Sequence, residues 1–235
     1  MRLPVAILAG GLATRLYPST RSIPKSLLEV AGKPFIEWQL EYLKNQGIAQ
    51  VVLCLGYLGE QIQGYLGTGE RYGLQLLYSF DGPSPLGTGG ALKRALPLLG
   101  DAFFVLYGDS YLPISFQDIE QAYDHRPSPA LMTIFKNKNQ WDRSNVWFKN
   151  GLLLEYNKDE PTPAMNYIDY GLSIINASGL SDYANVEPFD LSTFYHHCSL
   201  QGALQGHEVF SRFYEIGTHK GWHETGVFLS TGAHQ

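Results

Sequence analysis

Short aliphatic runs alternate with helical patterns in the first half of the chain, and this alternation restricts the fold more than any other feature. The runs are predicted to be strands buried on both faces, at residues 4–9, 50–55, 74–78 and 102–107. The predicted helices are residues 34–45, 59–66 and 89–99. Because strands that are joined through helices make right-handed crossovers, the pattern predicts an α/β fold with a mainly parallel sheet flanked by helices. Such sheets bind ligands beyond the carboxyl ends of their strands.

The second half of the chain has a different pattern, with strands following one another more directly. The predicted strands are residues 130–135, 145–148, 152–156 and 168–175. Residues 149–151, Lys-Asn-Gly, are typical of a hairpin turn between two of them. Helices are expected to return only at residues 189–201 and from residue 219 onward. No linker divides the chain, so we expect one domain, residues 1–235, in which the second half adds mixed strands to the same sheet.

Charge and composition exclude several classes of protein. The formal net charge of −5 argues against a broad surface for DNA or RNA, so no nucleic acid partner is expected. No apolar run reaches the roughly 18 residues that a membrane-spanning helix needs, and the first residues lack a secretory signal, so we expect a cytoplasmic protein without a membrane partner. Cys54 and Cys198 are expected to be reduced.

The most informative segment spans residues 8–35, LAGGLATRLYPSTRSIPKSLLEVAGKPF. Gly10 and Gly11 follow a predicted buried strand and allow the backbone to turn its N–H groups toward a ligand. Arg15 and Lys25 add a forked donor and a compact charge, a combination that suits a polyphosphate. The loop lacks the Gly-Lys-Ser/Thr of the common ATPases and the third glycine of a dinucleotide fingerprint. A tight turn is the structural alternative for the glycine pair alone.

The same segment resembles the signature of the sugar-1-phosphate nucleotidyltransferases, which have a similar order of glycines, Arg, Pro-Lys and Gly-Lys-Pro. Further blocks at residues 86–92 (LGTGGAL), 107–112 (YGDSYL) and 213–218 (FYEIGT) resemble blocks of this family in the same order. The second half is similar to the short bacterial branch that activates heptose, mannose or N-acetylmuramic acid 1-phosphates. The resemblance implies a Rossmann-like nucleotidyltransferase sheet, with nucleotide bound by residues 1–112 and sugar phosphate by residues 113–235.

The resemblance also implies a reaction and a set of site residues. A sugar 1-phosphate attacks the α-phosphate of a nucleoside triphosphate and expels pyrophosphate, so these two substrates are the expected partners. Mg²⁺, for which Mn²⁺ can substitute, is the expected cofactor. The predicted roles are catalysis by Arg15 and Lys25, nucleotide binding by Leu8, Gly10, Gly11, Arg15, Gly87 and Thr88, metal binding by Asp109 and Glu215, and sugar-phosphate binding by Asn145, Lys158, Tyr170 and Gly171.

Most of these residues also have structural alternatives. Asp109 follows a buried strand, where a parallel sheet presents its ligands, but it could instead cap a helix or form a turn. Glu215 could be an exposed carboxylate beside a turn, and Asn145, Tyr170 and Gly171 could serve packing. Two departures from the family pattern are Ala13, where glycine is usual, and Glu215, where aspartate is usual.

The sequence leaves the substrates open. GTP with heptose or mannose 1-phosphate is the first choice, and UTP with muramate or hexose 1-phosphate is the second. A metal-dependent glycosyltransferase is the rival reaction, although it has no need of the Arg15 and Lys25 loop. A non-catalytic sensor of nucleotide sugars is the alternative from another class. The residues do not determine an oligomeric state.

Overall fold

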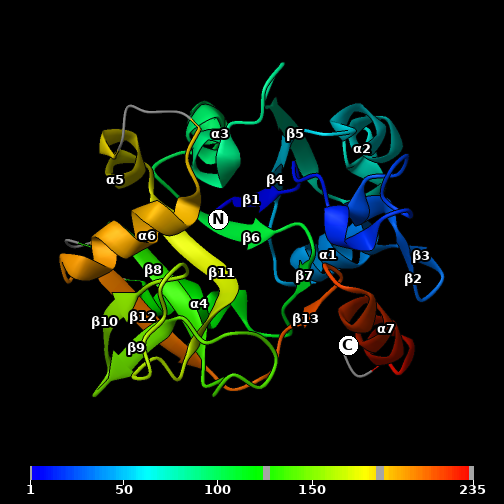
Figure 1. The fold of residues 1–235 in the computed structure, drawn as a ribbon. Coiled ribbons are helices and arrows are strands. Elements are labelled where there is room, and N and C mark those ends of the chain that lie inside the picture. Colours follow the sequence, from blue (N-terminus) through cyan, green and yellow to red (C-terminus); the bar gives the residue numbers. More distant parts are fainter. Residues whose placement is uncertain (1, 124–127, 184–187, 233–235) are drawn as a thin grey trace.

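A seven-stranded sheet forms the centre of the computed structural model, which describes residues 2–123, 128–183 and 188–232 (Figure 1). The order across this sheet is β12-β8-β11-β6-β1-β4-β5. Its strands are β1 (Val5–Leu8), β4 (Gln50–Leu55), β5 (Gln75–Phe80), β6 (Ala102–Tyr107), β8 (Ala130–Phe135), β11 (Ile168–Asn176) and β12 (Leu204–Val209). Strand β11 runs antiparallel to both neighbours, whereas the other pairs are parallel. The sheet is therefore mainly parallel, as predicted.

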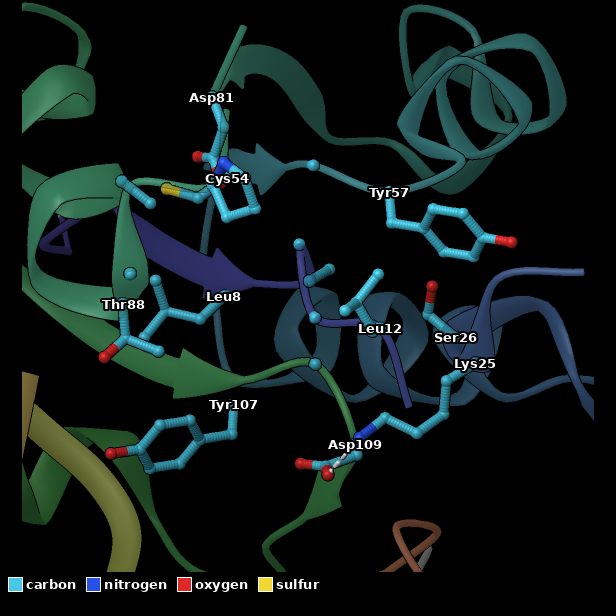
Figure 2. A pocket seen from close by; sticks show the side chains of 18 of the residues that line it. Leu8, Leu12, Lys25, Ser26, Cys54, Tyr57, Asp81, Thr88, Tyr107 and Asp109 are labelled. Carbon is cyan, nitrogen blue, oxygen red and sulfur yellow. Dashed lines mark hydrogen bonds and ion pairs between the residues drawn. The ribbon is translucent and has the colours of Figure 1, made fainter. Parts of the chain in front are cut away.

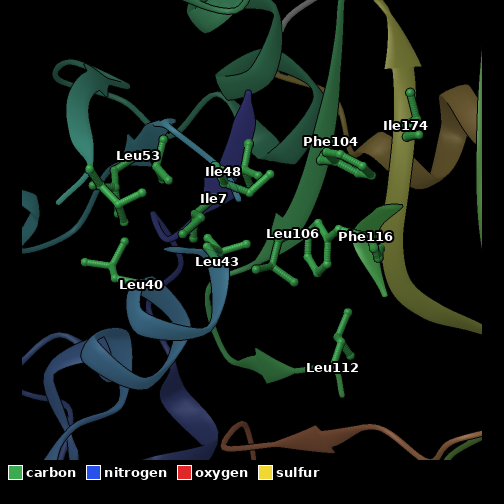
Figure 3. Close-up of a cluster of buried hydrophobic side chains, with 14 of the residues drawn as sticks. Ile7, Leu40, Leu43, Ile48, Leu53, Phe104, Leu106, Leu112, Phe116 and Ile174 are labelled. Atoms are coloured by element: carbon green, nitrogen blue, oxygen red, sulfur yellow. The ribbon is translucent and has the colours of Figure 1, made fainter. Parts of the chain in front are cut away.

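Helices cover both faces of this sheet. One face carries α1 (Phe35–Asn45), α2 (Gly59–Leu66) and α4 (Phe116–Ala122). The other carries α3 (Gly87–Ala95), α5 (Ala177–Asp182) and α6 (Leu191–Leu200). Figure 3 shows Leu40 and Leu43 of α1 facing Ile7 and Leu53 of the sheet. Alternate residues of β1 and β6 enter the two buried clusters, so these central strands are apolar throughout.

Smaller elements complete the described chain. The short strands are β2 (Glu29–Val30), β3 (Lys33–Pro34), β7 (Ser110–Tyr111), β9 (Val146–Lys149), β10 (Leu152–Tyr156) and β13 (Tyr214–Glu215). Single 3₁₀ turns occupy Thr14–Leu16, Lys25–Leu27, Glu70–Tyr72 and Leu96–Leu98. Helix α7 (His219–Ser230) packs over β2 and over the antiparallel pair of β7 and β13, in a small cluster that contains Val30, Tyr111, Ile216 and Leu229. The pairing of β7 with β13 places Tyr214 and Glu215 close to the carboxyl end of β6.

Several predictions about individual elements were confirmed. The predicted strands at residues 50–55, 102–107, 130–135 and 152–156 have the bounds of β4, β6, β8 and β10. The hairpin turn between β9 and β10 is also present. Asn150 (φ 54°) and Gly151 (φ 79°) both adopt left-handed backbone conformations, which a two-residue turn of this kind requires.

Two predictions were wrong in detail, and one strand was missed. Strand β5 is not buried on both faces, because it is the edge of the sheet, and Gln75 is exposed. Helices do not return only at residues 189–201 and 219 onward, since α4 and α5 precede them. Strand β12 was not predicted, because its two buried residues, Leu204 and Val209, stand at opposite ends of a polar stretch. Among the described residues, none of the helices combines the length and apolar character needed to cross a membrane.

Candidate active site

A cavity of about 520 Å³ lies beyond the carboxyl ends of β1, β4, β5 and β6, where an α/β sheet is expected to bind its ligand. Figure 2 shows Asp81 and Cys54 at one end of it and Lys25 and Asp109 at the other. Its lining includes Leu8, Gly10, Gly11, Gly87 and Thr88, which were predicted for nucleotide binding, Lys25, which was predicted for catalysis, and Asp109, which was predicted for metal binding. The structure thus brings together residues that are up to a hundred positions apart.

Bare backbone forms one wall of the cavity. The loop after β1 meets the loop after β4 so closely that a β-carbon on Gly56 would lie 2.7 Å from the carbonyl oxygen of Gly10. A β-carbon on Gly10 would lie 3.0 Å from the nitrogen of Gly56. These two glycines are therefore required for packing as well as for access by a ligand.

The glycine loop keeps unused hydrogen-bond donors. Among the described residues, no backbone carbonyl accepts a hydrogen bond from the N–H groups of Gly10, Gly11 or Leu12. Ala13 itself adopts the left-handed conformation (φ 51°, ψ 39°), and Thr20 Oγ1 donates to its carbonyl oxygen at 2.9 Å. The missing family glycine is thus replaced by a strained alanine and not by a shifted turn. The loop can offer several N–H groups to an anion.

The two predicted catalytic cations lie in different surroundings. Lys25 Nζ is 2.5 Å from Asp109 Oδ2, and both side chains are 22% exposed. Arg15 is exposed and lies outside the cavity lining, on the 3₁₀ turn that follows Ala13. Its guanidinium nevertheless reaches the region of Asp109, because both groups approach Gly217.

The two predicted metal ligands approach the same point. A β-carbon on Gly217 would lie 2.8 Å from Glu215 Oε2, 3.1 Å from Asp109 Oδ2 and 3.4 Å from Arg15 Nη2. Asp109 does not cap a helix, since β7 follows it. Glu215 accepts hydrogen bonds from the N–H of Gly217 and from Thr218 Oγ1, so its carboxylate is held in place at the start of α7.

The chemistry of these two carboxylates fits a divalent cation. The ammonium group of Lys25 already occupies the position of a cation on Asp109 Oδ2. In the part of the chain that the structure describes, no three His, Cys, Asp or Glu side chains gather at one point. Magnesium commonly uses one or two carboxylates and takes its other ligands from water and phosphate. Asp109 and Glu215 match that sparse set.

The end of the cavity opposite Lys25 contains a carboxylate that the sequence analysis missed. Asp81 is 8% exposed, and its Oδ2 accepts a hydrogen bond from the N–H of Leu86 at 3.3 Å. Arg94 Nη1 donates to the carbonyl oxygen of Asp81 at 2.7 Å and fixes the backbone there. Burial raises the pKa of the Asp81 carboxyl, opposed by the Leu86 N–H and Arg94. The strand-end argument that selected Asp109 applies equally to Asp81, which follows β5.

The strip at residues 86–90 has a packing role besides lining the cavity. Phe189 covers it, and a β-carbon on Gly87 would lie 2.8 Å from the carbonyl carbon of Phe189. Thr88 Oγ1 accepts a hydrogen bond from the N–H of Leu191 at 2.8 Å, which ties the cavity wall to the start of α6. Asp190, the N-cap of α6, lies next to this contact.

Lys158, one of the predicted sugar-side residues, lies next to Asp190 at the start of α6. Lys158 Nζ is 3.8 Å from Asp190 Oδ2, and about half of each side chain is exposed. Asn145 Oδ1 accepts a hydrogen bond from the N–H of Asp169, whose own carboxylate accepts from the N–H of Gly171. Burial raises the pKa of Asp169 to about 6, although Gly171 and the charge of Lys158 lower it. Asp169 was not predicted, since nothing local marks it within an antiparallel strand.

The burial of Tyr170, one of the residues predicted for the sugar site, favours the packing alternative for its side chain. Its side chain is 2% exposed, packs against Phe135 and Phe213, and donates to the carbonyl oxygen of Arg212. Alternate residues of a strand face opposite sides of a sheet, so Tyr170 enters the core while Asp169 faces the other way. The pairing with β8 is irregular between Asp169 and Ser173, where Gly171 has φ 104°.

The mainly parallel sheet, with a glycine-rich loop, two cationic side chains and two carboxylates near the carboxyl ends of its strands, fits an enzyme that acts on nucleoside polyphosphates. The chain belongs to the nucleotidyl transferase family, whose model matches residues 5–144. It is a sugar-1-phosphate nucleotidyltransferase, the class to which its relatives belong.

Two relatives illustrate this membership, and one solved structure shows the shared fold. D-glycero-alpha-D-manno-heptose 1-phosphate guanylyltransferase of Campylobacter jejuni is 30% identical over 190 residues, which cover 80% of this chain and 82% of that protein. N-acetylmuramate alpha-1-phosphate uridylyltransferase of Neisseria meningitidis is 44% identical over 111 residues, which cover 47% of this chain and 48% of that one. The crystal structure of HddC from Yersinia pseudotuberculosis has the same fold, with a TM-score of 0.82 at 22% identity, and covers 97% of this chain and 100% of its own.

Proposed function

We propose that this enzyme transfers GMP from GTP to a heptose or mannose 1-phosphate, releasing pyrophosphate and forming a GDP-sugar. The observation that carries the choice of GTP is Asp81, a carboxylate at the end of the cavity opposite Lys25. The similarity over four-fifths of the chain to a heptose 1-phosphate guanylyltransferase supports the same choice. Since nucleoside triphosphates are cellular substrates, the proposed location is the cytoplasm.

Asp81 favours guanine on chemical grounds. Guanine presents two adjacent N–H donors, at N1 and at the 2-amino group, and a carboxylate accepts two parallel hydrogen bonds. Uracil has one N–H between two carbonyl oxygens, so its edge would place an oxygen against the second carboxylate oxygen. A site that is built to satisfy particular polar groups rejects a base that leaves them unpaired.

The two halves of the chain have separate proposed tasks. All residues that line the cavity fall between Leu8 and Asp109, which supports nucleotide binding by residues 1–112. We assign the sugar phosphate to residues 113–235, with Lys158 facing its phosphate and with Asn145 and the backbone at Gly171 near its hydroxyl groups. Asp169 takes the place that was assigned to Tyr170, because it faces away from the core that buries the tyrosine.

The reaction needs charge neutralisation and alignment more than proton transfer. An oxygen of the sugar phosphate, already ionised at neutral pH, attacks the α-phosphorus of GTP as the bond to pyrophosphate breaks. Arg15 and Lys25 stabilise the charge on the phosphates, while N–H groups of the glycine loop bind their oxygens. Asp109 and Glu215 would hold Mg²⁺, with Mn²⁺ as a substitute, and the ion would supply further positive charge at the α-phosphate.

A second candidate is the transfer of UMP to N-acetylmuramate 1-phosphate, which the 44% identity over 111 residues to a uridylyltransferase favours. A matrix of GTP, UTP, ATP, CTP and dTTP against heptose, mannose, glucose and muramate 1-phosphates separates the candidates, with pyrophosphate release as the measurement. We expect the highest kcat/KM with GTP and a heptose or mannose phosphate. A maximum with UTP would contradict the proposal, and no pyrophosphate with any pair would indicate a non-catalytic sensor.

Replacement of Asp81 by asparagine is expected to change base selection. The amide keeps the shape but presents a donor where guanine also donates, and hydrogen bonds to charged groups contribute enough for kcat/KM with GTP to fall about tenfold to a hundredfold. We expect kcat/KM with UTP to fall much less, so the GTP-to-UTP ratio drops. Asp101→Asn, an exposed change at the amino end of β6, is the control. An unchanged ratio in Asp81→Asn would contradict the assignment.

Glu215→Gln tests the second proposed metal ligand. The amide oxygen can accept from Thr218 Oγ1 or from the Gly217 N–H but not from both, so we expect a small drop in melting temperature together with loss of the charge that holds the ion. We expect severe loss of activity and, for Glu215→Asp, partial activity with a shifted preference between Mg²⁺ and Mn²⁺. Wild-type turnover by Glu215→Gln across a magnesium titration would leave Asp109 as the lone carboxylate ligand.

A further inference from the structure

Gln39 of α1 links the core to the turn that carries Asp109. The side chain is 2% exposed, and its Nε2 donates to the carbonyl oxygens of Tyr107 at 3.0 Å and Ser110 at 2.8 Å. These carbonyls stand immediately before and after Gly108 and Asp109. One amide group therefore bridges both ends of the turn.

The amide orientation follows from these contacts. A reversed amide would place its oxygen against two carbonyl oxygens, which only accept. In the observed orientation, Gln39 Oε1 is buried and has no hydrogen-bond partner among the described residues. Buried polar atoms are usually paired, so the position of Gln39 satisfies the turn and leaves its own acceptor without a partner.

The bridged turn also supports the second carboxylate. Gln39 donates to the carbonyl oxygen of Ser110, and Ser110 pairs with Glu215 where β7 and β13 run antiparallel. The carbonyl oxygen of Asp109 accepts a hydrogen bond from the N–H of Ile216 at 2.9 Å. Gln39 therefore contacts the segment that carries Asp109 and pairs with the strand of Glu215, but it does not line the cavity.

We infer that Gln39 is a positioning residue, which orients the Asp109 turn so that Asp109 and Glu215 meet at one cation. The inference rests on the proposed metal site. Without the amide, the two carbonyls must find other donors, and the Asp109 carboxylate loses its fixed direction. Outer groups that orient metal ligands typically change metal affinity about 10-fold to 100-fold when they are removed.

The test compares Gln39→Met with Gln50→Met. Methionine has a similar length and is apolar, so Gln39→Met removes the donor and keeps the core filled. Gln50 Nε2 makes a comparable bond to the carbonyl oxygen of Leu98 at 2.8 Å, at the amino end of β4 and far from the site. Binding of Mn²⁺ alone is measured by the electron paramagnetic resonance signal of the free ion, together with melting temperature and the Mg²⁺ dependence of turnover.

We expect both variants to melt at somewhat lower temperatures, whereas only Gln39→Met binds Mn²⁺ about tenfold more weakly. Its half-saturating Mg²⁺ concentration for turnover should rise in parallel, while kcat at saturating Mg²⁺ stays near the wild-type value. Mn²⁺ affinity and Mg²⁺ dependence within about twofold of wild type would overturn the inference and leave Gln39 with a purely structural role.

Gln39→Asn covers the case in which the methionine variant does not fold. Asparagine keeps the donors but is shorter by one methylene, so it cannot make both bonds, and an intermediate loss of Mn²⁺ affinity is expected. Wild-type affinity in this variant would contradict the inference. If the wild-type protein bound no Mn²⁺, the metal site and the role of Gln39 would both be wrong, whereas formation of a GDP-sugar tests the proposed transfer separately.

Discussion

Lys25→Ala and Arg15→Ala are each expected to lower turnover by about a hundredfold to a thousandfold while leaving the fold intact. Removal of one preorganised charge-stabilising donor commonly has an effect of this size. Neither side chain belongs to the buried core, since Lys25 is 22% exposed and Arg15 is exposed at the surface. The measurement is steady-state pyrophosphate release with saturating substrates, combined with circular dichroism and thermal melting.

Two other cations provide matched controls for these variants. Lys33 pairs with Glu41 and lies 3.7 Å from the centre of the Trp38 ring, outside the cavity. Arg71 pairs with Glu37 at 3.4 Å, near the surface of α1. Lys33→Ala and Arg71→Ala should therefore keep turnover near the wild-type value. Near wild-type turnover by Lys25→Ala or Arg15→Ala would contradict the catalytic role that is proposed for that residue.

Asp109→Asn is expected to abolish activity and the response to divalent cations. The amide preserves size but removes the charge that would hold the ion, and it also releases Lys25 from the 2.5 Å ion pair. The wild-type enzyme should be inactive in EDTA and recover with Mg²⁺ or Mn²⁺. Activity at each cation concentration is the measurement, and Mn²⁺ binding provides a readout that does not depend on turnover.

Asp118→Asn is a suitable control for this change, because Asp118 lies in the exposed first turn of α4. It should behave as wild type in every titration. Undiminished wild-type turnover in EDTA would contradict a metal requirement. If the Asp109→Asn protein were active and still needed Mg²⁺, the ion would have to be bound by residues other than Asp109. Loss of folding in Asp109→Asn would instead show that the ion pair with Lys25 is structural.

The ion pair between Lys25 and Asp109 also bears on the roles that are proposed for these two side chains. In the proposed mechanism Asp109 binds a cation and Lys25 binds a phosphate, and in this structure the two side chains pair with one another at 2.5 Å. A bound metal ion would become the new partner of Asp109, and a bound triphosphate would become the new partner of Lys25. The two predicted roles are therefore consistent with a single location, although the sequence alone gave no sign that the two side chains touch.

The glycine loop and the central sheet could be predicted from the sequence because their causes are local. Buried strands such as β1 and β6 carry continuous apolar runs, and a glycine pair after a strand marks a turn with free N–H groups. Even the departure at Ala13 was visible, although the structure was needed to show that alanine itself adopts the left-handed conformation. The resemblance to a family block, supported by strand-end position, selected Asp109, and strand-end position alone also applies to Asp81.

The remaining features depended on contacts between distant segments. Glu215 approaches Asp109 only because β13 pairs with β7, and Gln39 reaches the same turn only because α1 packs beneath β6. The proposed choice of Asp169 over Tyr170 depended on which side chains of β11 enter the cluster beneath α1, α2 and α4, and an irregular pairing near Gly171 obscures that alternation in the sequence. Side-chain periodicity determines which residues are buried, whereas hydrogen-bonded pairing between remote strands determines which polar groups meet.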